Sequence, residues 1–274
     1  MKLTVLMENS AAGPVACAHG LSLFVEAAGH RILFDAGPDG ALLVRNAEAL
    51  GVDLASADLA VLSHGHYDHS GGMEAFLERN ERAALCLRRS ALEPHGALCP
   101  DGSEEDVGVS PALASRFAAR LRFTEPLEQL APGLTLFSDE PGTALLSGSF
   151  ASFREAGHAD DFGHEQNLLL SENGLLVLLA GCAHRGIVNI LDRAAEIAGR
   201  APDAVFAGFH LTRPGTGTDE PDSLIRAVGE RLAAYPNTVY YTGHCTGAHA
   251  YQILEEYLPG RLHPMSCGRV FEIV

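Results

Sequence analysis

The sequence predicts an α/β protein whose β-sheets are covered by helices on their outer faces. Short apolar runs separated by glycine- and proline-bearing turns dominate the first third of the chain, as expected for strands. Later, apolar runs alternate with segments of helical composition, which is the pattern of βα units. Histidines follow directly after several apolar runs, and side chains at strand ends gather at one edge of a sheet.

The first third of the chain is expected to form strands joined by turns, with two helices. The expected strands are Leu3–Met7, Leu21–Ala27, Arg31–Asp35, Asp58–Leu62 and Ala83–Leu87. Helical composition marks Ala41–Leu50 and Gly71–Asn80.

The pattern loosens between about residues 90 and 155, where the chain becomes polar and rich in turn residues. A helix at Pro111–Ala119 and short strands at Leu121–Phe123 and Leu134–Phe137 are expected there. We interpret this segment as a variable elaboration of a single domain spanning residues 1–274, with loops that face the substrate. A solvated surface excursion is the alternative.

Regular structure is expected to return in the last part of the chain. A hairpin around Glu172-Asn173-Gly174 would pair Asn167–Ser171 with Leu175–Ala180. The other expected strands are Ala204–Ala207, Thr238–Tyr241 and Arg269–Ile273, and the expected helices are Ile187–Ala198, Ser223–Ala234 and Ala248–Tyr257.

The charge balance excludes several classes of partner. The formal net charge of −16 comes from 19 basic and 35 acidic residues, so the surface should repel nucleic acid and anionic lipid. Lys2 is the only lysine, which excludes Schiff-base chemistry and a phosphate-loop lysine. We therefore expect a small-molecule substrate; the oligomeric state is left open.

Other features of the composition bear on location and cofactor. No apolar run reaches the roughly 18 residues that span a membrane, and the N-terminal residues are typical of a strand rather than a secretory signal. A cytoplasmic location is therefore expected. The six cysteines form no C-x-x-C pair, which argues against a zinc ribbon or a disulfide framework.

The segment His64-Gly65-His66-Tyr67-Asp68-His69 places three imidazoles and a carboxylate within six residues. His64 and His66, two residues apart at a strand end, can point to the same side. Asp68 and His69 follow as the chain turns, so they can face a second ion. Because two metals about 3.5–4 Å apart are the usual hydrolytic arrangement, the segment predicts a metal site.

Four further histidines stand where apolar runs end, and an aspartate ends an earlier strand. His164, His184, His210 and His244 are candidate ligands or catalytic groups, although a lone histidine is more often structural. Asp35 could accept a hydrogen bond from the second nitrogen of a ligating histidine and fix its tautomer, or it could cap a turn.

Several motifs resemble those of the metallo-β-lactamase superfamily. They are Phe34-Asp35-Ala36-Gly37 and the histidine-rich segment continued by Ser70-Gly71-Gly72. One branch is similar in later motifs too, namely His164-Glu165-Gln166-Asn167-Leu168, Gly181-Cys182-Ala183-His184-Arg185-Gly186, Gly208-Phe209-His210-Leu211 and Thr242-Gly243-His244-Cys245-Thr246-Gly247. That branch is named for the archaeal synthase that joins a dihydropterin to ribofuranosylaminobenzene phosphate in methanopterin biosynthesis.

The resemblance implies a four-layer αβ/βα sandwich with a dinuclear site at one edge. It implies that the first ion is bound by His64, His66 and His164, and the second by Asp68, His69 and His244. Where most members carry a bridging aspartate, this sequence has Cys182. A thiolate bridge would favour zinc or iron over magnesium or calcium; alternatively, His184 supplies the contact. Two divalent ions are thus expected, zinc first, with iron or manganese as alternatives.

The expected activity is hydrolysis of a phosphorylated or ester small molecule through a metal-bound hydroxide. Asp68, His184 and His210 are the candidates for catalytic roles. Arg185 and Arg213 lie beside strand ends and could bind a substrate phosphate or be solvated surface residues. The alternatives are a transferase of the synthase type and an iron-dependent redox or metal-sensing protein.

Overall fold

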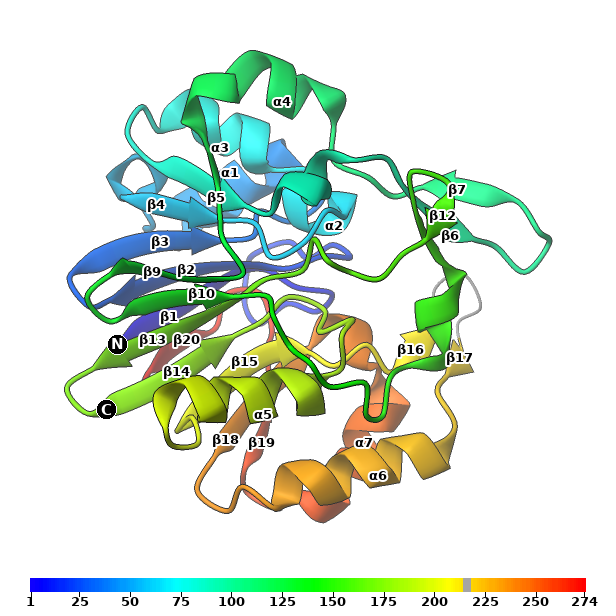
Figure 1. The fold of residues 1–274 in the computed structure, drawn as a ribbon. Coiled ribbons are helices and arrows are strands. Elements are labelled where there is room, and N and C mark those ends of the chain that lie inside the picture. The colour runs from blue at the N-terminus through cyan, green and yellow to red at the C-terminus, as the bar shows by residue number, and fades with distance from the viewer. Residues whose placement is uncertain (214–217) are drawn as a thin grey trace.

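The computed structural model describes residues 1–213 and 218–274 and has the four-layer αβ/βα arrangement that was predicted. Two seven-stranded sheets face each other, and each carries helices on its outer face (Figure 1). In the described residues, no helix is long and apolar enough to cross a membrane.

The first sheet is built mainly from the N-terminal third. Its strands, in spatial order, are β20 (Val270–Glu272), β1 (Lys2–Met7), β2 (Ser22–Ala27), β3 (His30–Phe34), β4 (Leu59–Val61), β5 (Ala84–Leu87) and β8 (Leu121–Phe123). The strands from β3 to β8 are parallel, so their carboxyl ends share one edge. The outer face is covered by α1 (Gly40–Ala49), α3 (Met73–Arg79) and α4 (Pro111–Phe117).

The second sheet contains the later βα units. Its order is β19 (Leu262–Pro264), β18 (Val239–Gly243), β15 (Ala204–Gly208), β14 (Leu175–Leu179), β13 (Asn167–Glu172), β10 (Leu134–Phe137) and β9 (Leu127–Ala131). The covering helices are α5 (Ile187–Ala198), α6 (Asp222–Ala233) and α7 (Ala248–Tyr257). Strands β14, β15, β18 and β19 are parallel.

The central core lies between the two sheets. Val5, Leu23 and Phe34 from the first sheet pack with Leu179 and Phe206 from the second, and all are buried. Strands facing a core on both sides explain the nearly continuous apolar runs of the sequence.

Local signals set the ends of the helices. Asp39 caps α1, because its carboxylate accepts a hydrogen bond from the Leu42 amide at 2.6 Å. Gly199 ends α5 in the left-handed conformation, with φ of 69°. The helix expected at Gly71–Asn80 instead begins at Met73, and a short helix, α2 (Tyr67–Ser70), precedes it. Gly71 separates the two helices. Its backbone lies so close to the Pro38 carbonyl that a Cβ atom at this position would collide with it.

The segment from about 90 to 155 is divided between the main sheets and a smaller one. Strands β8, β9 and β10 extend the two main sheets, whereas β6 (His95–Leu98) and β7 (Glu104–Asp106) form a hairpin that projects from the body (Figure 1). It pairs with β11 (Phe153–Glu155), which pairs with β12 (His158–Ala159). Strands β16 (Thr212–Arg213) and β17 (Thr218–Asp219) form a separate ribbon. That the whole chain is one domain stays a prediction.

Candidate metal centre

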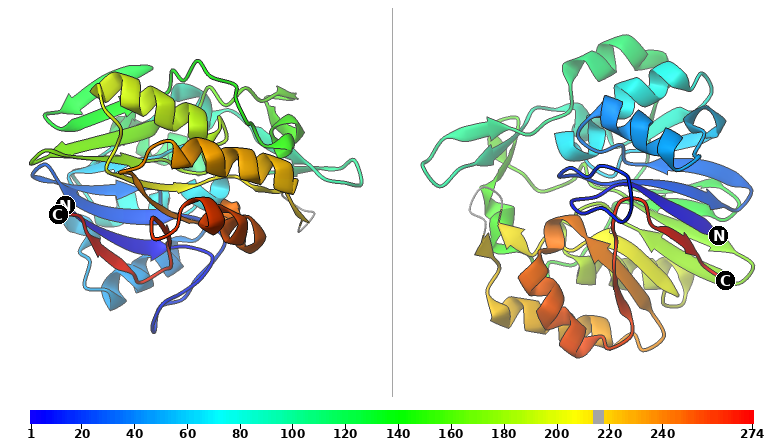
Figure 2. Two further views of the ribbon diagram at one scale, coloured as in Figure 1. Left: turned by 90° about the horizontal axis from the view of Figure 1, so that it is seen from below. Right: turned by 180° about the vertical axis from the view of Figure 1, so that it is seen from behind.

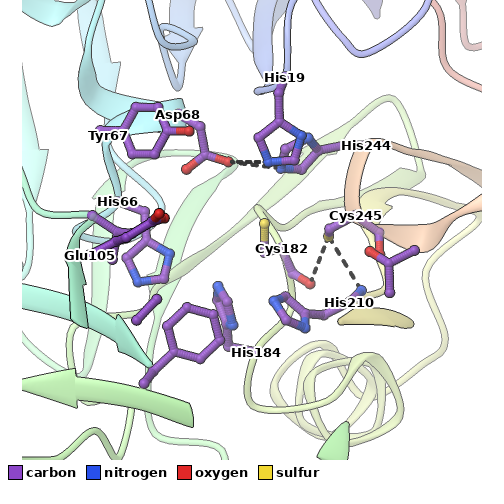
Figure 3. A pocket seen from close by; sticks show the side chains of 14 residues that line it. His19, His66, Tyr67, Asp68, Glu105, Cys182, His184, His210, His244 and Cys245 are labelled. Atoms are coloured by element: carbon purple, nitrogen blue, oxygen red, sulfur yellow. Dashed lines mark hydrogen bonds and ion pairs between the residues drawn. The ribbon is translucent and has the colours of Figure 1, made fainter. Parts of the chain in front are cut away.

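The carboxyl ends of strands from both sheets meet around one pocket. His64 and His66 follow β4, and α2 carries Asp68 and His69. From the second sheet come the residues after β14, β15 and β18. The pocket has a volume of about 240 Å³ (Figure 3). Its lining includes His66, Asp68, Cys182, His184, His210, His244 and Cys245.

Three imidazoles form the first group of candidate ligands. Ligand atoms of His64, His66 and His184 lie within 4.8 Å of one another, and Nε2 of each ring is buried without a hydrogen-bond partner. Burial lowers the pKa of all three well below the usual value, so each ring is neutral. Buried polar atoms without partners are rare, and neutral imidazoles suit transition metals. A divalent cation therefore fits this group.

The tautomer of His64 follows from its neighbours. Ser63 Oγ donates its single proton to Asp35 Oδ2 at 2.7 Å, so at 2.8 Å from His64 Nδ1 it can only accept. Nδ1 of His64 therefore carries the proton, and the orphaned Nε2 presents a lone pair.

Asp68, His69 and His244 form the second group. Nε2 of His69 lies 3.3 Å from Nε2 of His244, which lies 3.3 Å from Asp68 Oδ2. Although burial opposes ionisation, the neighbouring histidines, His69 foremost, hold the pKa of Asp68 well below its usual range. A cation fits here because a carboxylate and two imidazoles converge in a buried space.

Asp35 holds His69 in place. The carboxylate accepts from His69 Nδ1 at 2.6 Å and from the Ser63 amide at 2.7 Å. This is the contact expected of an aspartate at the end of this strand. Burial alone would lower the pKa of His69, but the Asp35 and Asp68 carboxylates raise this pKa to about 9.

Cys182 lies between the two groups. Its Sγ is 3.2 Å from His69 Nε2 and within 4.8 Å of the ligand atom of His64. Burial raises the pKa of the Cys182 thiol well above its usual value. A bound cation would reverse that effect, since coordination deprotonates a thiol.

His164, the third ligand that the resemblance implies for the first ion, has other partners. Its Nδ1 accepts from the Gly65 amide at 2.9 Å, and its Nε2 lies 3.0 Å from Asp160 Oδ2. The first contact requires a lone pair on Nδ1, so the neutral ring carries its proton on Nε2 and donates it to Asp160. Although these atoms and His66 are close enough to hold an ion, neither His164 nitrogen is free for one. Metal binding by His164 stays a prediction, and the geometry favours His184.

His210 forms part of the pocket wall. Its ring centroid is 4.1 Å from that of His184, and its Nδ1 is 3.1 Å from Ser149 Oγ. Burial, with His244 nearby, lowers the pKa of His210 to about 4. The ring is therefore neutral near pH 7 and can accept a hydrogen bond.

Three residues after β1 complete the site and were not anticipated. The exposed His19 places Nε2 3.3 Å from Asp68 Oδ2. Asn9 Oδ1 accepts from His244 Nδ1 at 2.9 Å, and Glu8 Oε1 accepts from the His244 amide at 2.6 Å. No spacing signal marks these residues, because they reach the site through a loop.

The two arginines proposed for a substrate phosphate have different outcomes. The guanidinium of Arg185 donates to the carbonyls of Asp161 and Glu140 and lies 3.3 Å from Glu140 Oε2, so it is held in the protein and does not line the pocket. The side chain of Arg213 lies outside the described part of the structure. Phosphate binding by either arginine stays a prediction.

The chain is similar to several known proteins. Residues 16–88 match the family model of the metallo-β-lactamase superfamily. A 7,8-dihydropterin-6-methyl-4-(β-D-ribofuranosyl)-aminobenzene-5′-phosphate synthase of Methanocaldococcus jannaschii is 26% identical over 99% of this chain and 96% of its own length. An uncharacterized protein of the same organism, MJ0448, is 25% identical over 76% of this chain and 79% of its own.

Solved structures are similar over the whole chain. Tm1679, described as a metal-dependent hydrolase of the β-lactamase superfamily, superposes with a TM-score of 0.83 and 26% identity, covering 100% of this chain and 99% of its own. Zinc-bound PqqB from Methylobacterium extorquens has a TM-score of 0.58 at 15% identity, covering 100% of both chains, and shows the fold alone. Together with the paired sheets and the histidine-rich edge, these matches show that the chain has the metallo-β-lactamase fold and that residues 16–88 match the superfamily's model.

Proposed function

We propose that this protein is a metal-dependent hydrolase that acts on a small phosphorylated or ester substrate. The observation that carries the proposal is the set of three buried, unpartnered Nε2 atoms beside Asp68 and Cys182, at the edge of a pocket. The similarity of the whole chain to Tm1679, which is described as a metal-dependent hydrolase, supports the same reaction class.

The proposed ligands follow the two groups. His64, His66 and His184 would hold the first ion, and Asp68, His69 and His244 the second, with Cys182 shared. We propose zinc, with iron or manganese as alternatives, because the donor set combines imidazole and thiol. When bound, such ions make water nucleophilic at neutral pH and stabilise charge on the substrate oxygens.

The pocket limits the substrate. At about 240 Å³, it is smaller than the roughly 300–1,000 Å³ of most ligand sites. Its described lining contains no lysine or arginine, so a substrate phosphate would be neutralised by the cations and the imidazoles. Phe153 and Val107 offer apolar contacts to the rest of the substrate, while Asp68 and His210 can accept hydrogen bonds from it.

The test is whether water is a substrate. The zinc-loaded protein is incubated with a panel of small phosphoesters and carboxylic esters in ¹⁸O-labelled water, and the products are examined by mass spectrometry. We expect one labelled oxygen in the phosphate or carboxylic acid product for each bond cleaved, with turnover lost after chelation and restored by zinc. Turnover without label would refute hydrolysis, and turnover that survives chelation would refute metal dependence.

A transferase is the second candidate. It is supported by the 26% identity to the synthase, which extends over 99% of this chain. In that case a nucleophile other than water would displace a leaving group in the same pocket. Product formation from a dihydropterin and an aminobenzene riboside phosphate, without ¹⁸O uptake, would favour this candidate over the first.

A further inference from the structure

We propose that Glu220, Ser147 and Ser149 are positioning residues that hold a proton on Nδ1 of His210, leaving Nε2 as an acceptor in the pocket. The tautomer follows from hydrogen bonding alone; only the use of Nε2 during turnover rests on the proposed function.

The four side chains form a continuous chain of hydrogen bonds. Ser147 Oγ lies 2.8 Å from Glu220 Oε1 and 2.7 Å from Ser149 Oγ, which lies 3.1 Å from His210 Nδ1. All four residues are at most 9% exposed. They come from separate places: Ser147 caps the short 3₁₀ helix Gly148–Ser152, which contains Ser149, whereas His210 follows β15 and Glu220 follows β17.

The direction of the chain is determined by its acceptor end. A carboxylate only accepts, so the single hydroxyl proton of Ser147 goes to Glu220. Ser149 must then donate to Ser147, because two hydroxyl oxygens 2.7 Å apart need a proton between them. With its own proton used, Ser149 Oγ can only accept from His210, and Nδ1 of His210 therefore carries a proton.

Hydrogen bonds from Nδ1 to oxygen acceptors also orient three of the candidate ligands. His64 donates from Nδ1 to Ser63, which donates to Asp35, and His69 and His244 donate from Nδ1 to oxygen acceptors. Of the three rings, His64 has an Nε2 without a hydrogen-bond partner, whereas Nε2 of His69 faces Cys182 and His244, and Nε2 of His244 faces Asp68. His210 lines the same pocket with its Nδ1 turned to Ser149, so its Nε2 would accept the O–H or N–H proton of a molecule bound there.

The experiment reads the tautomer directly. Zinc-loaded protein labelled with ¹⁵N-histidine is studied by long-range ¹H–¹⁵N correlation NMR, with the His210 signals assigned by their loss in His210→Gln. We expect the Nδ1–H form in the wild type and in Ser149→Thr, which keeps the hydroxyl. Ser149→Ala should lose the bias towards this form. Ser147→Ala should shift the ring towards Nε2–H, because Ser149 is then free to donate.

Ser152→Ala is the control. It makes the same chemical change in the same short helix, but Ser152 is not part of the series of hydrogen bonds, so the tautomer of His210 should be unchanged. An Nε2–H tautomer in the wild type would overturn the proposal, as would Ser147→Ala and Ser149→Ala spectra identical to the wild type. If Ser149→Ala does not fold, Ser147→Ala against Ser149→Thr decides the question. None of these outcomes depends on turnover, so failure of the hydrolase assignment would leave this test intact.

Discussion

At the scale of single residues, Cys182 has the most direct chemical consequence. Its sulfur lies close to His69 and within reach of His64, which belong to different ligand groups. A shared thiolate would link the two ions and soften the site towards zinc or iron.

Replacing Cys182 by alanine should therefore lower the metal content from two equivalents per chain to one, without unfolding the protein. Elemental analysis of both proteins, with circular dichroism to verify folding, measures this. Cys99→Ala removes a thiol away from the site and should keep two equivalents. A Cys182→Ala protein that also keeps two would show that the thiol is no ligand. Visible absorbance of the purified wild type would instead point to iron.

His184 and His164 should respond differently to substitution. His184 has an unpartnered Nε2 beside His64 and His66, whereas both nitrogens of His164 have partners. We expect His184→Ala to lose the first ion. We expect His164→Gln to retain both ions, with a moderate loss of thermal stability because the Gly65 amide and Asp160 lose their shared partner. Metal titration by calorimetry distinguishes the two, and loss of an ion only in His164→Gln would restore the assignment that the resemblance implied.

At the scale of elements, the two sheets approach closely at the edge that carries the site. A Cβ on Gly181, just after β14, would collide with Ser63 Oγ and lie 3.1 Å from His64 Nδ1. A Cβ on Gly208 would meet the Cys245 sulfur at 2.5 Å. Glycine at position 181 lets residues from the two sheets reach one another, and glycine at position 208 leaves room for Cys245 of the neighbouring strand end.

Gly181→Ala should thus displace Ser63 and, through it, His64 and Asp35. We expect a loss of about 1–3 kcal/mol in unfolding free energy from overpacking, and a roughly 10–100-fold weaker metal affinity because the groups that orient the ligands move. Urea unfolding of the metal-free protein separates the first effect from the second, which metal titration measures. An unchanged metal affinity would mean that the sheet edge accommodates the added methyl group without moving the ligands.

Several elements have the bounds that the sequence predicted. The predicted bounds of Leu121–Phe123, Leu134–Phe137, Ile187–Ala198 and Ala248–Tyr257 are those of β8, β10, α5 and α7. Strand β9 was missed because Leu127–Ala131 has residues that favour helices, and its pairing with β10 decides its conformation. The hairpin of β6 and β7 was missed because β7 is made of exposed acidic residues.

The candidate site was only partly predictable for a different reason. The close spacing of His64, His66, Asp68 and His69 reflects one continuous segment, which a sequence displays directly. The role of His164 depends on the Gly65 amide, 99 positions away, and on Asp160. Such partners are recognisable only in the folded chain. The contact of His19 with Asp68 could not be predicted for the same reason.

At the scale of the whole molecule, a buried acid makes stability depend on pH. Glu140 is 1% exposed, and burial, with Glu165 nearby, raises its pKa to about 7 from the ordinary value of 4.5. The folded state therefore holds this proton more tightly than the unfolded state. As pH rises from 4.5 to 7, the unfolded state ionises first, and the unfolding free energy falls.

Glu140→Gln should remove the part of this dependence that Glu140 contributes, while Glu165, whose pKa burial also raises to about 7, keeps its own part. Relative to the wild type, the variant should gain up to roughly 3 kcal/mol of unfolding free energy between pH 4.5 and pH 7, with no further gain above. Urea unfolding at a series of pH values measures the difference, and Glu230→Gln, a change at an exposed glutamate, is the matched control. Parallel pH profiles for the Glu140→Gln variant and the wild type would contradict the prediction.

The pairing of β20 with β1 joins residues from opposite ends of the described chain (Figure 2). Thr4 pairs with Val270, and the amino group of Met1 donates to the Ile273 carbonyl at 3.0 Å. During synthesis, the outer edge of β1 therefore stays without its partner strand until residues 270–272 have left the ribosome. For that interval the nascent first sheet has an open edge that can capture another strand. The order of translation thus leaves the nascent sheet open to pairing with other chains until β20 has been made.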